Sequence, residues 1–94
     1  MRKYEVMYIL RPDVEQEILD ATVAKFQGII SNGGEIVNHD LMGKRRLAYE
    51  IKKFREGIYV LVNFNAPAEV VNELERLMKI SDEVIRYLIV QDVA

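Results

Sequence analysis

Residues 2–10, RKYEVMYIL, carry their side chains in the two-residue period that is typical of a β-strand. One face of this strand would present Tyr4, Val6, Tyr8 and Leu10. The opposite face would present Lys3, Glu5, Met7 and Ile9. The stretch therefore predicts a first strand with an apolar side that packs on a core.

A helix is expected after this strand and should run to about Ser31. Asp13 is placed to cap its first turn, with Gln16 three residues later as the reciprocal partner. Residues 32–34, Asn-Gly-Gly, should end the helix, since glycine takes left-handed backbone angles at little steric cost. The apolar stripe at helical spacing consists of Leu19, Val23, Phe26 and Ile30.

Two long extended segments follow. Residues 35–51 favour a second strand, in which Gly43 indicates a bulge or bend. Residues 52–57 are polar, end in glycine and are a plausible hairpin connection, and residues 58–65 again alternate as a third strand. The chain is therefore expected to form a hairpin in its middle third.

A second helix and a last strand complete the chain. Pro67 suits the first helical turn, and the helix should end near Ile80. Ser81 and Asp82 make a turn into residues 84–90, which are rich in β-branched side chains. The apolar stripe of this helix consists of Val70, Val71, Leu74, Leu77 and Met78.

The order strand, helix, strand, strand, helix, strand is the split βαβ pattern of ferredoxin-like α+β folds. Right-handed crossovers then give a four-stranded antiparallel sheet in the order 4-1-3-2, with both helices on one face and the other face open. The predicted core packs Leu19, Val23, Phe26, Ile30, Val70, Leu74 and Leu77 against Val6, Tyr8, Val60, Val62 and Phe64.

Composition limits the class of protein. With 94 residues and half of them apolar, residues 1–94 are expected to form a single domain. No apolar run approaches the roughly 20 residues that cross a bilayer, and the N-terminus lacks the apolar stretch of a signal peptide, so a cytosolic protein is expected. The absence of cysteine excludes disulfides and thiolate metal sites, and fits a reducing compartment.

The charges are unevenly distributed. Between Gly43 and Gly57 six basic residues stand against two acidic ones, a local charge of +4 in a chain of net charge −2. Residues 67–83 hold five acidic residues against two basic ones, or −3. A basic hairpin opposite an acidic helix suits one RNA-facing surface. The alternative is a solvated hairpin with lysines that discourage edge-to-edge aggregation.

The open face of the sheet is expected to be apolar at its centre. Met7 and Ile9 on the first strand would lie beside Tyr59 and Leu61 on the third, because the alternate residues fill the core. Clustering there favours a protein-binding face, whereas scattered apolar residues are normal on any surface. The predicted partner-binding residues are Met7, Ile9, Tyr59, Leu61, Arg86 and Leu88.

Residues for catalysis or for cofactor binding are few. His39 has no second histidine or cysteine to share a metal, and is expected to be a solvated or hydrogen-bonded strand residue. Neither serine has a nearby histidine in sequence, and Ser81 fits a turn. Gly33 and Gly34 follow a helix, whereas a phosphate loop needs glycines before one. No enzymatic activity, cofactor, metal or small-molecule substrate is predicted.

The segment GKRRLAYEIK, residues 43–52, resembles the signature of the bacterial ribosomal small-subunit protein six family. The opening MRKYEVMY with Arg11-Pro12, and LMKISD before Ile85-Arg86-Tyr87, are similar as well, so the resemblance covers essentially the whole chain. It implies a ferredoxin-like fold, binding to the central domain of small-subunit ribosomal RNA, and a heterodimer with ribosomal small-subunit protein eighteen. Some relatives carry an acidic C-terminal extension, and no role of such a tail is carried over.

Together, the basic hairpin and the resemblance predict which side chains contact RNA phosphates: Arg2, Lys44, Arg45, Arg46, Lys52, Lys53 and Arg55. Two other readings stay open. An RNA-recognition motif shares the fold and stacks bases on central-strand aromatics, but Leu61 stands where a second aromatic would be expected after Tyr59. A small acyl-phosphate hydrolase or an amino-acid sensor would also fit the fold.

Overall fold

The computed structural model describes residues 1–91 of the chain. Its elements follow the predicted order. They are β1 (Arg2–Leu10), α1 (Gln16–Gly33), β2 (Glu35–Ile51), β3 (Phe54–Ala66), α2 (Ala68–Ile80) and β4 (Val84–Gln91). The expected strand and helix types are all confirmed, and differences lie only at their ends.

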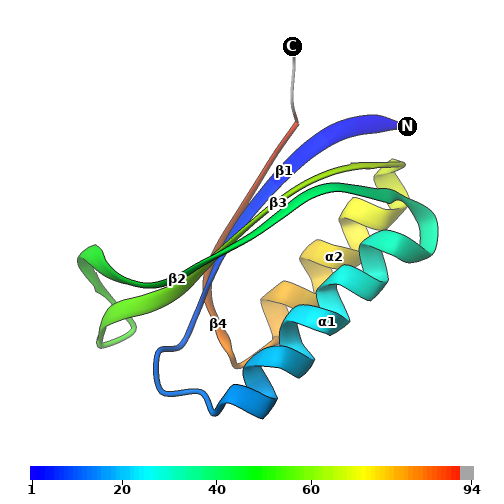
Figure 1. Cartoon of the computed structure of the whole chain (residues 1–94). Coiled ribbons are helices and arrows are strands. Elements are labelled where there is room, and N and C mark those ends of the chain that lie inside the picture. The colour runs from blue at the N-terminus through cyan, green and yellow to red at the C-terminus, as the bar shows by residue number, and fades with distance from the viewer. Residues whose placement is uncertain (92–94) are drawn as a thin grey trace.

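The four strands form one antiparallel sheet in the order β2-β3-β1-β4, as predicted. Both helices cover one face of the sheet, and the β2–β3 hairpin projects beyond the helical layer at the left of the view (Figure 1). Two packed layers with one sheet face uncovered are therefore the frame on which any site must be built.

The main core lies between the sheet and the helices, where the sequence pattern placed it. Val6, Val60 and Leu74 are completely buried, and Phe26 packs edge-on against Tyr8 with ring centroids 5.2 Å apart. Every residue of the predicted core belongs to this cluster, with Val23, Val70 and Leu77 only partly buried at its edge. The predicted facing of β1 and β3 is thus confirmed.

The expected caps of α1 were wrong at both ends. Asp13 instead accepts two hydrogen bonds of 3.1 Å from the Arg11 guanidinium, because a charged fork is a stronger donor than a backbone amide. The helix begins at Gln16, which donates to Asp20 at 2.9 Å. Gly34 is extended rather than left-handed, and glycine is needed because a Cβ there would lie 2.5 Å from the Asn65 carbonyl oxygen.

The hairpin turn is tighter than predicted. Ile51 pairs with Phe54, and the two residues between them, Lys52 and Lys53, have φ of 50° and 71°. Positive φ at both positions is the signature of a type I′ turn, whose twist suits a two-residue hairpin. Gly57 was therefore wrongly placed in the loop, since it is a buried residue of β3. The expected bulge at Gly43 is confirmed, with φ of +88°.

Candidate nucleic-acid and protein interfaces

The tip of the β2–β3 hairpin carries the dense positive charge that the sequence predicted. All six of its cations are exposed: Lys44, Arg45, Arg46, Lys52, Lys53 and Arg55. Of these six cations, only Arg55 lies within 4.0 Å of a carboxylate of residues 1–91, that of Glu50. The type I′ turn holds both lysines at the extreme end of the hairpin. This arrangement leaves most of the charge available to an external polyanion.

Arg2 is not brought together with the hairpin. It pairs with Ala66 at one end of β3, whereas Arg45 pairs with Gly57, nine residues away along the same strand. At ~3.3 Å per residue this separates the two arginine positions by about 30 Å. The two places lie at opposite ends of the sheet in Figure 1, where the N-terminus and the hairpin are far apart.

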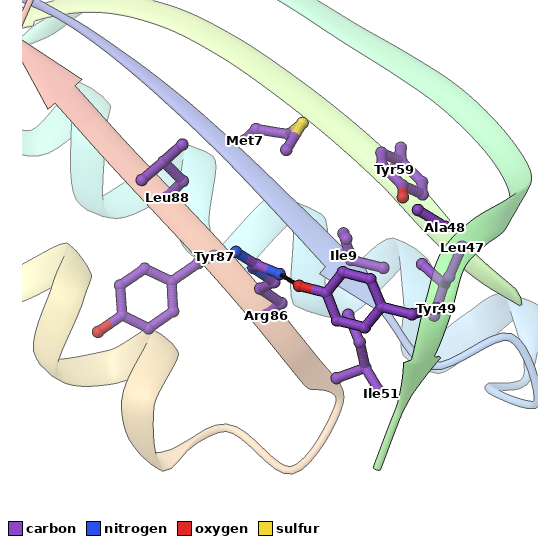
Figure 2. Close-up of a pocket in the computed structure, with 10 residues that line it drawn as sticks. All are labelled: Met7, Ile9, Leu47, Ala48, Tyr49, Ile51, Tyr59, Arg86, Tyr87 and Leu88. Atoms are coloured by element: carbon purple, nitrogen blue, oxygen red, sulfur yellow. Dashed lines mark hydrogen bonds between the residues drawn. The ribbon is translucent and has the colours of Figure 1, made fainter. Parts of the chain in front are cut away.

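The predicted partner-binding residues do converge on the open face, in two rows across three strands. One row runs from Leu88 through Met7 to Leu61, as the strand registers show. The next row contains Arg86, Ile9 and Tyr59. Most of them line one pocket, whose other walls are Leu47, Ala48, Tyr49, Ile51 and Tyr87. Figure 2 shows this pocket between the end of β2 and the strands β1, β3 and β4.

Ile9 was wrongly expected to face solvent. Only 3% of Ile9 is exposed, because Leu47 from β2 and Ile85 from β4 pack against it in a second small apolar cluster. Gly57 makes room for this packing, since a Cβ there would overlap the Ile9 Cγ2 atom. The open face is therefore covered at its hairpin end. Met7, Tyr59 and Leu61 are half-buried, and Leu88 remains 55% exposed.

Leu47, Tyr49 and Ile51 are site residues that the sequence argument missed. They alternate along β2 and so share one face of an extended segment, which is the signal that was available. Tyr49 lies 61% exposed over the pocket, and its hydroxyl accepts a hydrogen bond from Arg86 Nη1 on β4 (Figure 2). These apolar residues were obscured by the six cations that surround them.

The groups considered for catalysis lie apart. His39 on β2 has a buried Nε2 with no hydrogen-bond partner among residues 1–91, so the prediction was wrong for that nitrogen. Ser81 makes the predicted turn, in which its carbonyl accepts the Val84 N–H at 3.2 Å. Within the described residues no three His, Cys, Asp or Glu side chains cluster to hold a metal. No helix in that range is long and apolar enough to cross a membrane.

The ionisable groups with perturbed pKa values do not line the pocket on the open face. The Arg11 guanidinium lowers the pKa of the Asp13 carboxyl by hydrogen bonding, and Arg76 does the same for Glu73 on α2. Burial raises the pKa of Tyr8, whose hydroxyl has no hydrogen-bond partner among residues 1–91. These shifts follow from packing and surface ion pairs. None of them assembles a proton-transfer site.

Known proteins match almost the whole length of this chain. The family model described as ribosomal protein S6 matches residues 3–91. The small ribosomal subunit protein bS6 of Carboxydothermus hydrogenoformans is 50% identical over 93 residues, which are 98% of this chain and 97% of that protein. The crystal structure of 30S ribosomal protein S6 from Thermotoga maritima superposes with a TM-score of 0.91 at 35% identity. That superposition covers 97% of this chain and 87% of the other.

Proposed function

The chain belongs to the ribosomal protein S6 family of the small ribosomal subunit, and from this membership we propose that it is a structural, non-catalytic component of that subunit. In this role it binds the central domain of small-subunit ribosomal RNA through the hairpin tip. It does so as a heterodimer with ribosomal small-subunit protein eighteen, which binds the open face of the sheet.

The observation that carries the RNA assignment is the exposed, largely unpaired charge of the hairpin tip. Arg45 and Arg46 present planar forks that suit phosphate oxygens, and Lys52 and Lys53 add point charges at the turn. Such contacts position a protein on RNA without reading its sequence. Arg2, which lies about 30 Å away along the sheet, contacts a separate phosphate of the same RNA.

Support for the partner face comes from the apolar rows on the open sheet. Burying four such side chains contributes on the order of 6 to 12 kcal/mol, whereas association costs about 4 to 15. Since Ile9 is already buried within the chain and Met7, Tyr59 and Leu61 are half-buried, the gain falls to about 2 to 5 kcal/mol. The remaining free energy needed for a stable complex would then come from rim contacts of Glu5, Asn63 and Arg86, or from joint binding to RNA.

A salt series tests the RNA assignment. If about three phosphates are neutralised, log affinity should fall with log salt at a slope of roughly −2 to −3. The double variant Arg45→Ala with Arg46→Ala should weaken binding to a central-domain transcript and make this slope shallower. Lys25→Ala with Arg76→Ala removes the same net charge from exposed helix positions, and should leave the slope unchanged. An unchanged slope in the arginine variant removes these residues from the RNA interface.

The competing reading, in which Tyr59 stacks on an RNA base, predicts a different pattern of losses. In our proposal Met7→Ala and Leu61→Ala weaken partner binding measured without RNA, and weaken RNA binding only when the partner is present. If calorimetry finds the protein pair intact while the isolated chain loses RNA affinity, the open face is an RNA platform and the partner assignment is wrong.

A further inference from the structure

The pairing of β2 with β3 is interrupted within the basic hairpin tip. The register of β2 against β3 shifts after Leu41 and again after Arg46, and pairing resumes only at Ile51. Residues 47–50 therefore have no paired residue on β3. A segment that lacks ladder partners keeps more conformational freedom than a paired strand. Lys44, Arg45 and Arg46 are paired with β3, and other contacts hold residues 47–50, which lie between these cations and the two lysines of the turn.

Leu47 supplies the main contact. It is 7% exposed and lies against Ile9 of β1 and Ile85 of β4. Its side chain therefore packs on the β1–β4 half of the sheet and not on β3, the partner strand of its own hairpin. In Figure 2 its side chain points from β2 toward Ile9. Gly57 keeps the space beneath this contact free of a competing Cβ. The apolar cluster thus attaches the tip to the body of the protein.

Two further contacts hold the hairpin tip. The Tyr49 hydroxyl accepts a hydrogen bond from Arg86 Nη1, across a sheet in which β3 and β1 lie between their strands. At the start of β3, the Arg11 guanidinium lies 5.3 Å from the centre of the Phe54 ring, within the range of a cation–π contact. The tip is therefore held at three points by residues from β1, β4 and the segment after β1.

The anchoring residue and the cations share one short extended segment. Successive side chains of a strand point to opposite sides, so turning Leu47 inward turns Arg46 outward. Arg46 is exposed and Leu47 is buried, as this alternation requires. A free tip would lose backbone freedom each time it bound RNA, whereas an anchored tip has already lost it.

We infer that Leu47, assisted by the hydrogen bond between Tyr49 and Arg86, is a positioning residue that holds the basic tip ready for RNA without touching RNA. The inference rests on the proposed RNA-binding role of the tip. It goes beyond that role because an apolar residue buried on the partner side of the sheet then sets RNA affinity.

The test uses the full chain saturated with protein eighteen and a transcript of the central domain of small-subunit RNA. Leu47→Ala should lower RNA affinity by about tenfold with an unchanged salt slope, since the same cations still reach the phosphates. Amide hydrogen exchange in residues 44–53 should become faster in this variant. Leu47→Met, which conserves volume, should restore affinity. Leu41→Ala is the matched control, because Leu41 is 49% exposed on the same strand and lies outside the cluster.

Tyr49→Phe keeps the ring and loses the bond to Arg86, so it tests the same idea if Leu47→Ala does not fold. A loss of about two- to fivefold is expected, again with the salt slope unchanged. The inference is overturned if the folded Leu47→Ala variant binds RNA with wild-type affinity while Arg45→Ala with Arg46→Ala binds weakly. If Leu47→Ala does not fold, the same result in Tyr49→Phe overturns it. In both cases the proposed RNA role of the tip is left intact. A slope as shallow as that of the arginine variant also overturns the inference. If the arginine variant too binds normally, the proposed RNA surface itself is wrong.

Discussion

Alanine substitution should affect two leucines on opposite sides of the sheet differently, one in folding stability and the other in partner affinity. Leu74 on α2 is completely buried against the core face, whereas Leu88 on β4 lies in the open face and is 55% exposed. Leu74→Ala should therefore reduce the free energy of unfolding, and Leu88→Ala should mainly reduce affinity for the partner protein.

The magnitudes follow from burial. Removing three carbons at Leu74 forfeits about 2.4 kcal/mol of transfer free energy at about 0.8 per carbon, and the cavity left behind brings the loss to about 2.5 to 4 kcal/mol. For a domain of this size, that lowers the melting midpoint by roughly 10 to 25 °C. At Leu88 just over half of the side chain remains to be buried by a partner. Its loss should cost about 1 kcal/mol of binding, or about fivefold in Kd.

Urea titration and calorimetry of the protein pair without RNA measure the two effects separately. Leu88→Ala should change the free energy of unfolding by less than about 1 kcal/mol, since surface substitutions are usually small. The assigned facing of the sheet would be refuted if both variants lost similar stability. An unchanged Kd for the partner in a well-folded Leu88→Ala variant would remove Leu88 from the protein interface.

Three further predictions concern single features of the fold. Tyr8→Phe should leave neutral-pH stability unchanged or raise it by up to about 1 kcal/mol in urea titration, because the buried hydroxyl has no partner in residues 1–91. Burial raises the pKa of Tyr8 above 10.0. The contribution of the neutral Tyr8 hydroxyl to the free energy of unfolding is therefore complete below pH 10.0 and is lost as the pH rises beyond it. Tyr8→Phe should lose less stability than the wild type in that alkaline range. Gly43→Ala should cost about 1 to 2 kcal/mol, measured the same way, since its φ of +88° strains any side chain. In an NMR titration the carboxyl pKa of Glu73 should lie below 4.5, and it should return toward 4.5 in Arg76→Ala. The ion pair therefore stabilises the fold at neutral pH, and this stabilisation is lost as the pH falls through the lowered pKa.

Much of the candidate site could be predicted because its residues belong to regular strands. Alternation along β1 and β3, with the expected topology, was enough to place Met7 beside Leu61 on the open face. The cations of the hairpin were evident from their density in sequence. Ile9 and Leu47 were not paired in advance, since their contact depends on how far the hairpin bends back over the sheet. The bulge at Gly43 was predicted, but the further register shift between Arg46 and Ile51 was not, since no local pattern specifies it.

The sequence by itself determined the elements, their facing and the fold, because side-chain period and glycine and proline positions act over a few residues. It also determined that a basic hairpin exists. Only the tertiary structure decided that Arg2 lies far from that hairpin and that Ile9 is buried. It alone placed Tyr49 of β2 on Arg86 of β4. These outcomes depend on contacts between residues distant in sequence, whose geometry is set by the twist and register of the whole sheet.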